Sequence, residues 1–321
     1  MLYVQSGYVR QSLHRRRQSY LKNCLDTGQA QLLFIFDRKV GVVRSENGFD
    51  IALFGPDRVP RDRREMLQAV FLGELDGTPV FSIACEEHPR NLLGLGCQPP
   101  LFVELRQATG MLAAESASLL GYALAMDHWH RSHRFCGACG SLTASGESGH
   151  MRICTNPDCE RKHFPRTDPA IIVLVANNDA CLLGRKREWP DRRYSTIAGF
   201  VEPGETPEQA VQREVFEETG IHVANIKYFA SQPWPFPGSL MLGYHAGALS
   251  ETIKLHDDEL QDARWYTRDE ILDWVPSGRL LLPSQISIAY SLLEEWFNRD
   301  DVPPLREIDK QGQHRAPITQ L

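Results

Sequence analysis

The segment GFVEPGETPEQAVQREVFEETGI, residues 199–221, is the most informative part of this chain for its fold and its chemistry. It opens as a glycine-punctuated loop, and good helix formers follow. The helix start is marked by an N-cap residue, a proline at the first helical position and a capping-box glutamine, namely Thr206, Pro207 and Gln209. Gly220 falls where a left-handed C-cap is expected. The segment therefore predicts a loop and a helix with both ends defined.

Three carboxylates share one face of this helix, because Glu214 and Glu218 are four residues apart and Glu217 lies beside them. Like charges so placed repel one another, so the cluster is better explained by divalent cations between the carboxylates than by a solvated acidic face. Oxygen ligands favour Mg²⁺ or Mn²⁺ over zinc, and such ions promote phosphoanhydride hydrolysis. Arg213 can orient the carboxylates through paired hydrogen bonds, with Glu205 as its expected partner.

The pattern G-x5-E-x7-R-E-V-x-E-E-x-G-I over residues 199–221 resembles a complete Nudix box. The resemblance implies an α/β/α sandwich around a mixed sheet that contains residues 170–176. It also implies that Glu214, Glu217 and Glu218 bind the catalytic Mg²⁺ or Mn²⁺. The general base is expected among these three, with Glu217 or Glu218 favoured over Glu214.

Four cysteines upstream form a C-x2-C pair and a C-x4-C pair, namely Cys136, Cys139, Cys154 and Cys159. Two chelating pairs suit tetrahedral zinc, and four thiolates leave no open position, so we expect one structural Zn²⁺. Residues 131–165 have too few aliphatic side chains to build a core, and the metal would hold them. Two redox pairs are the alternative interpretation. Three nearby histidines are expected to be surface or packing residues: His128, His130 and His133.

Downstream of the box, residues 231–239 read SQPWPFPGS. Prolines interleaved with aromatics make a rigid segment that can present flat faces to a base or a nicotinamide ring. Gln232 and Ser239 offer hydrogen bonds. The alternative is a structural proline–aromatic loop. Together with the upstream cysteines, the segment resembles the NADH pyrophosphatase branch of the Nudix family, over roughly residues 131–293.

This second resemblance implies cleavage of NAD(H) to nicotinamide mononucleotide and AMP. Carried over by position, it makes the Ala198 backbone and Glu259 further metal ligands. Phe164 stands where the family often has tyrosine, so ring stacking is kept and the hydroxyl bond is lost. The expected substrate contacts are Phe164, Gln232, Pro233, Trp234, Pro235, Phe236, Pro237, Gly238, Ser239 and Ala289.

The 321 residues predict a multidomain α/β (α+β) protein. Short apolar runs alternating with turn signals indicate a mostly β N-terminal domain over residues 1–130, with one or two helices within residues 104–129. The zinc ribbon is assigned to residues 131–165, the Nudix domain to residues 166–297 and a loose tail to residues 298–321. The sequence shows no internal repeat.

The formal net charge of -6 argues against a protein that coats nucleic acid. The longest apolar run, residues 170–176, is far below the roughly 20 residues of a membrane helix, so no membrane partner is expected. Cys24, Cys85, Cys97 and Cys181 are interpreted as small core residues in a reducing, cytoplasmic compartment. The first 25 residues are basic and free of acids, which leaves a transit peptide as a minor alternative.

Two other functions stay open. The same pocket could remove NAD caps from RNA 5′ ends, with basic residues of the ribbon contacting the strand. Alternatively, the chain could be a non-catalytic regulator that senses a nucleotide, although no box glutamate is missing. The family resemblance further implies a homodimer.

Overall fold

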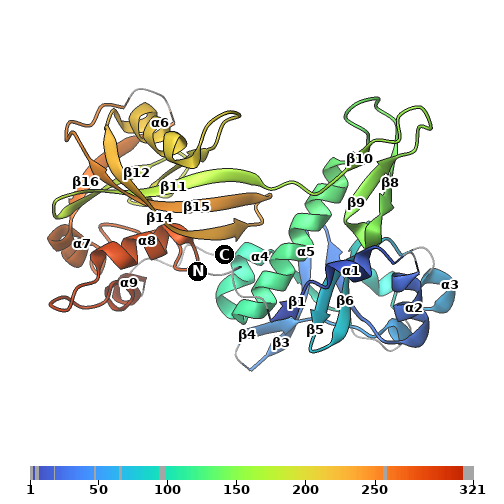
Figure 1. Cartoon of the computed structure of the whole chain (residues 1–321). Coiled ribbons are helices and arrows are strands. Elements are labelled where there is room, and N and C mark those ends of the chain that lie inside the picture. The colour runs from blue at the N-terminus through green and yellow to red at the C-terminus, as the bar shows by residue number, and fades with distance from the viewer. Residues whose placement is uncertain are drawn as a thin grey trace. The chain divides into compact units, whose positions relative to one another are not determined.

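The computed structural model describes residues 3, 7–17, 19–46, 48–64, 67–93, 99–255 and 259–313, with side chains to residue 310. Cys97 and residues 314–321 of the expected tail lie outside this range. The described chain divides into two compact units (Figure 1). The C-terminal unit contains residues 168–233 and 239–313, and the N-terminal unit contains the residues before 168 together with Trp234–Gly238.

The C-terminal unit is built on a mixed sheet of order β14-β15-β11-β12-β16, with β13 also on β11. Its strands are β11 (Asp168–Asn177), β12 (Ala180–Arg185), β13 (Ile197–Phe200), β14 (Val223–Trp234), β15 (Ser239–Ala248) and β16 (Asp262–Thr267). Its helices are α6 (Pro207–Thr219), α7 (Arg268–Trp274), α8 (Ile288–Phe297) and α9 (Leu305–Gln313). β11 runs parallel to β15 and antiparallel to β12 and β13.

Both faces of this sheet are covered, because alternate side chains of β11 enter two separate cores. Ile171 and Val173 pack with residues of α6, whereas Ile172 and Leu174 pack with residues of α7, α8 and α9. Figure 1 shows α6 on one face and the other three helices on the opposite face. The expected α/β/α sandwich with a mixed sheet is confirmed.

The expectation of a loose tail is wrong for its middle part. Residues 305–313 form helix α9, and Leu305 and Ile308 are buried against the core beneath α8. The amphipathic spacing of these two side chains, three residues apart, supplies the driving force for docking.

The N-terminal unit contains a seven-stranded sheet of order β1-β5-β6-β2-β3-β4, with β7 on β3. Its strands are β1 (Tyr8–Val9), β2 (Gln31–Phe36), β3 (Lys39–Ser45), β4 (Gly48–Ile51), β5 (Ala69–Leu75), β6 (Thr78–Cys85) and β7 (Leu101–Val103). Its helices are α1 (Ser12–Arg15), α2 (Tyr20–Thr27), α3 (Arg61–Arg64), α4 (Leu105–Ala108) and α5 (Ala114–Ser132). The ribbon adds β8 (Thr143–Gly146), β9 (Met151–Cys154) and β10 (Lys162–His163). Short 3₁₀ turns lie at Pro56–Arg58, Pro89–Asn91, Thr109–Met111 and Glu147–Gly149.

The two sheets share most of one topology, although the sequence shows no internal repeat. Counted from β2 and from β11, the first strand runs parallel to the fifth and antiparallel to the second, as β2 does to β6 and β3, and β11 to β15 and β12. The third strands pair differently, because β4 lies on β3 whereas β13 lies on β11. The units differ between the third and fourth strands. There the C-terminal unit has the helix α6, whereas the described N-terminal residues have only a 3₁₀ turn and the four-residue α3.

Three of the four scattered cysteines are buried as expected: Cys24, Cys85 and Cys181. Among the described helices, none is both long enough and apolar enough to cross a membrane.

Candidate active site

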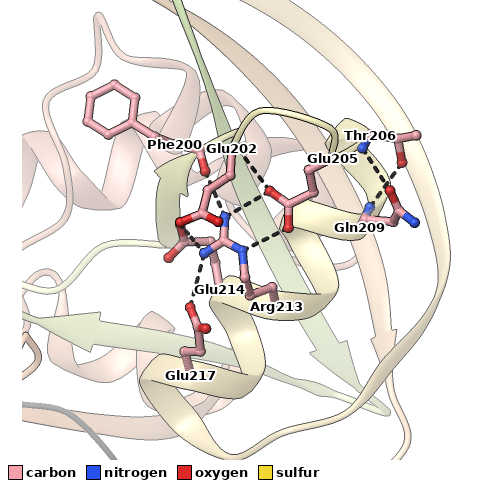
Figure 2. A network of polar contacts seen from close by, with 8 residues as sticks. All are labelled: Phe200, Glu202, Glu205, Thr206, Gln209, Arg213, Glu214 and Glu217. Atoms are coloured by element: carbon pink, nitrogen blue, oxygen red, sulfur yellow. Dashed lines mark hydrogen bonds and ion pairs between the residues drawn. The ribbon is translucent and has the colours of Figure 1, made fainter.

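The loop after β13 and the helix α6 form as the sequence predicts. Thr206 Oγ1 accepts a hydrogen bond from the Gln209 backbone N–H at 3.3 Å, and Gln209 Oε1 accepts one from the Thr206 N–H at 2.8 Å (Figure 2). Gly220 closes the helix with a φ of 70°, in the left-handed region that favours glycine. The box carboxylates therefore project from a helix that is fixed at both ends.

Arg213 binds three carboxylates at once (Figure 2). Its Nε and Nη2 donate to the two oxygens of Glu205 at 2.7 and 2.9 Å, a bidentate pair. Its Nη1 donates to Glu214 at 2.9 Å and to Glu217 at 3.0 Å. The expected pairing with Glu205 is present, and the hydrogen bonds from Arg213 lower the pKa of the Glu205 carboxyl. The guanidinium thus fixes the box carboxylates relative to the preceding loop.

Glu214 and Glu218 are the box carboxylates with the least exposure. The Glu214 side chain is only 13% exposed. Burial raises the pKa of Glu214, Arg213 lowers it, and the charges of Glu217 and Glu259 raise it again. Glu218 is buried, with 2% exposure. One arginine therefore faces a group of carboxylates held close together, a donor set of the kind that oxygen-binding divalent cations occupy.

Gly199 is needed for this arrangement because a side chain at this position would collide with Glu214. A Cβ at this position would lie 1.9 Å from the carboxyl carbon of Glu214. Only glycine leaves room for that carboxylate beside β13. The Glu214 side chain of α6 can therefore pack directly against the backbone of this strand. The sequence placed Gly199 in a loop, whereas it lies in β13, and its contact with Glu214, fifteen positions away, was missed.

The two expected metal ligands outside the helix lie on other elements of the same unit. Ala198 is in β13, opposite Ile172 of β11. Glu259 precedes β16, and the Lys186 ammonium lies 3.5 Å from its Oε2. Lys186 was not anticipated from the sequence. The charge of Glu259 is one of the causes that raise the pKa of Glu214, which is consistent with a shared site.

The crowded carboxylates predict that Mg²⁺ stabilises the fold. Because the pKa of Glu214 is raised in the folded state, its ionisation opposes folding at neutral pH, and a bound cation would offset this. We expect Mg²⁺ at about 100 times its Kd to add about 2.7 kcal/mol to the unfolding free energy. Thermal unfolding with MgCl₂, compared with NaCl at equal ionic strength, measures this. An equal effect of both salts would contradict it.

The expected substrate residue Gln232 is completely buried and makes internal hydrogen bonds. Its Oε1 accepts from the Ile288 N–H and its Nε2 donates to the Ile286 carbonyl, both at 2.8 Å. These bonds fix the start of α8, where Ala289 is also buried. A substrate contact by either residue stays a prediction.

Replacing Gln232 with alanine should therefore destabilise the fold. The change leaves the Ile288 N–H without this partner in a buried place, which costs about 1–3 kcal/mol. Denaturant unfolding measures the loss. The matched control is Gln212→Ala, at an exposed position of α6. Equal stability of the two variants would show that the internal bonds of Gln232 contribute nothing.

The aromatic residues of the downstream segment pack within the N-terminal unit. The ring centroids of Trp234 and Phe236 are 5.3 Å apart in an edge arrangement, and Tyr3 contacts both rings. The Arg106 guanidinium lies 4.8 Å from the Phe236 centroid. Pro235 is buried, whereas Pro237 and Pro233 are exposed, and Phe236-Pro237 is a cis peptide. These contacts support the structural interpretation of Trp234 and Phe236.

The ends of this segment and Phe164 are more open. Gly238 and Ser239 are half-buried, and Ser239 begins β15 opposite Asp168. Phe164 is 55% exposed and lines a cavity of about 680 Å³ within the N-terminal unit, which Arg161 also lines. Its ring is therefore available for stacking, as expected.

The four ribbon cysteines converge. Their sulfur atoms all lie within 4.8 Å of one another, with Cys139 and Cys154 3.4 Å apart and Cys136 and Cys159 3.8 Å apart. A φ of 76° at Gly140 allows the tight turn after the first pair. Four thiols so placed fit tetrahedral zinc. His130 and His133 bond the backbone carbonyls of Gly149 and Trp129, so their expected packing roles are confirmed.

Three family models match the chain. A NUDIX domain matches residues 166–285, an NADH pyrophosphatase-like rudimentary NUDIX domain matches residues 30–129, and an NADH pyrophosphatase zinc ribbon domain matches residues 131–164. The second match coincides with the repeated topology of the N-terminal unit.

Similar curated proteins cover most of the chain. The NAD-capped RNA hydrolase NudC of Pseudomonas aeruginosa is 39% identical over 257 residues, 80% of this chain and 86% of that protein. The protein of the same name from Mycobacterium bovis is 39% identical over 71% of this chain and 75% of that protein. The human NAD-capped RNA hydrolase NUDT12 is 36% identical over 74% of this chain and 52% of that protein. The chain thus matches about half the length of NUDT12.

Proposed function

Because the chain belongs to the NADH pyrophosphatase family of Nudix hydrolases, with a zinc ribbon, we propose that it hydrolyses the pyrophosphate bond of NAD(H) to nicotinamide mononucleotide and AMP. The observation that carries the proposal is the binding of Glu205, Glu214 and Glu217 by the single guanidinium of Arg213. This arrangement holds the carboxylates in a fixed geometry before any substrate binds.

Each residue of the site has a separate task in this proposal. Glu214, Glu217 and Glu218, with Glu259 and the Ala198 carbonyl, would hold Mg²⁺ or Mn²⁺. The bound ions would neutralise the pyrophosphate and lower the pKa of water. Arg213 and Glu205 are positioning residues, because they act through the other carboxylates.

The proton balance requires a base on the chain. Water attacks one phosphorus, the bond from that phosphorus to the bridging oxygen breaks, and each product leaves as a monophosphate. We assign the water proton to Glu217 or Glu218. Glu217 is 52% exposed and so is open to solvent, which favours it over the buried Glu218.

NAD at the 5′ end of RNA is the second candidate substrate. The relatives are named NAD-capped RNA hydrolases, and basic residues surround the exposed ring of Phe164, namely Arg161, Lys162 and Arg166. A capped RNA shares the same pyrophosphate, and its backbone would contact these cations.

The discriminating experiment compares kcat/KM for NADH and for NAD-capped RNA. If RNA is recognised, kcat/KM for the capped RNA should fall steeply with salt because backbone contacts release counterions, whereas that for NADH should change less. A neutral triple substitution at Arg161, Lys162 and Arg166 should then lower only the RNA rate. Equal loss on both substrates would reject a strand-binding role for these residues.

We also propose a homodimer in the cytoplasm. The dimer follows from the family resemblance, and light scattering of the purified protein tests it. None of the seven described cysteines forms a disulfide, which suits a reducing compartment, and fractionation of the source cells tests the location.

A further inference from the structure

The N-terminal unit contains a cavity of about 450 Å³ that none of the box residues lines. Its walls come from β2, β5 and β6, from the last turns of α5, and from β8 and β9 of the ribbon. Figure 1 shows these ribbon strands beside the C-terminal end of α5. The volume is within the range of pockets that bind small molecules.

Small and polar side chains keep this space open. Val80, Ser82 and Ala84 alternate along β6 and so share one face of the sheet. Val80 is in the apolar core beneath α5, but Ser82 and Ala84 line the cavity, as does Gln68 beside β5. A leucine or valine at these positions would extend the core into the cavity, as elsewhere on this face.

A buried cation, Arg152, lines the cavity and is 8% exposed. Its Nε donates to Thr143 Oγ1 at 2.6 Å, its Nη2 donates to the Thr143 carbonyl at 2.7 Å, and its Nη1 lies 2.9 Å from His130 Nδ1. His130 Nε2 lies 2.8 Å from the Gly149 carbonyl, so His130 accepts from Arg152 as a neutral ring. Among the described residues, Arg152 makes no ion pair. A buried charge with only neutral partners is costly unless an anion joins it.

A second arginine increases the positive charge. Arg134 also lines the cavity, and it is exposed. No ion pair of Arg134 occurs in the described part of the chain. Arg131 differs, since its Nε lies 2.9 Å from both oxygens of the buried Asp127. Glu86 and Arg134 are both exposed at the cavity wall, whereas Arg152 is buried. Arg152 is therefore the buried cation of this cavity, and Arg134 adds a second guanidinium at its exposed side.

We propose that this cavity binds the phosphate group of a small phosphate monoester between Arg134 and Arg152. Guanidinium groups bind phosphate through paired charge-assisted hydrogen bonds. Ile35, Val70 and Ala84 supply an apolar wall for the organic part of the ligand. A nucleoside monophosphate and inorganic phosphate share the recognised group. The site lies outside the proposed reaction, and it would be a regulatory site.

The test is calorimetric titration of the zinc-loaded full-length protein with AMP, inorganic phosphate and adenosine, without added divalent cation. AMP should bind and adenosine should not. Binding of phosphate alone would assign the site to the free anion, and tighter binding of AMP would assign it to nucleotides. Absence of binding by both phosphate compounds would overturn the proposal.

Variants locate the binding. Arg134→Gln should weaken AMP binding at least about tenfold, because it removes a charge-assisted bond. Arg61→Gln, the same charge change on exposed α3, should leave binding unchanged. Ala84→Phe should block the cavity without changing any charge, and Glu217→Gln should retain binding. If Glu217→Gln loses AMP binding whereas Arg134→Gln and Ala84→Phe retain it, then AMP binds at the box carboxylates. The proposed cavity site would then be rejected. The readout does not depend on turnover, so failure here leaves the proposed reaction intact.

Discussion

Replacing Glu217 with glutamine is expected to lower the kcat for NADH by about a hundred- to a thousandfold while the protein stays folded. The substitution removes one charge from the proposed metal site and from the Arg213 network, and a lost electrostatic contact at a reacting centre costs about this much. Because Glu217 is 52% exposed, its pair with Arg213 contributes little to stability. Steady-state kinetics and thermal unfolding of the same preparation measure both effects.

The matched control is Glu208→Gln, on the exposed first turn of the same helix. It removes an equal charge from α6 outside the Arg213 network and should leave kcat nearly unchanged. Similar losses in the two variants would mean that the charge of the helix matters and not the position of Glu217. The assignment of Glu217 to the metal site would then be wrong.

Replacing Cys154 with serine is expected to abolish zinc binding and to unfold the ribbon. Cys154 is buried, and its sulfur lies 3.4 Å from that of Cys139. Structural zinc contributes on the order of 10 kcal/mol or more to folding a segment of this kind. We expect zinc content to fall from one ion per chain to none, with rapid proteolysis within residues 136–163.

A cysteine outside the cluster provides the control for this experiment. Cys24→Ser removes a buried thiol of the N-terminal core and should keep one zinc ion per chain. Retention of zinc by Cys154→Ser, or an intact ribbon after zinc is removed, would contradict the structural role of the metal.

Local signals predicted the box well. The capping pattern of Thr206 and Gln209 and the C-cap at Gly220 act over a few residues, so the sequence alone specifies the limits of α6. The Arg213–Glu205 pair was also predictable, because less than two turns of helix and a short loop connect the two residues. The four zinc cysteines were predictable because their C-x2-C and C-x4-C spacing can be read directly from the sequence.

Features that depend on distant contacts were not predictable. The side chain of Gln232 accepts a hydrogen bond from the Ile288 N–H at the start of α8, more than fifty residues downstream. From the sequence, the polar side chain suggested only a substrate contact. The closeness of Gly199 to Glu214 likewise needs the strand and the helix together. Helix α9 was missed because its two buried apolar residues, Leu305 and Ile308, are surrounded by polar ones.

The repeated sheet topology illustrates the same limit on a larger scale. Strand order and direction can persist when side chains have diverged, because many apolar sequences satisfy one pattern of packing. In the N-terminal unit, the short α3 occupies the chain position of α6 and carries arginines instead of glutamates. Related sheet topologies therefore occur in this one chain both with and without the glutamates of the box.

The most direct measurement is product analysis after incubation of the purified protein with NADH and Mg²⁺, beside a Glu218→Gln variant. We expect equal amounts of AMP and reduced nicotinamide mononucleotide from the native protein and none from the variant. Intact NADH after incubation with the native protein, or equal cleavage by the variant, would contradict the proposal that the box carboxylates hydrolyse this pyrophosphate.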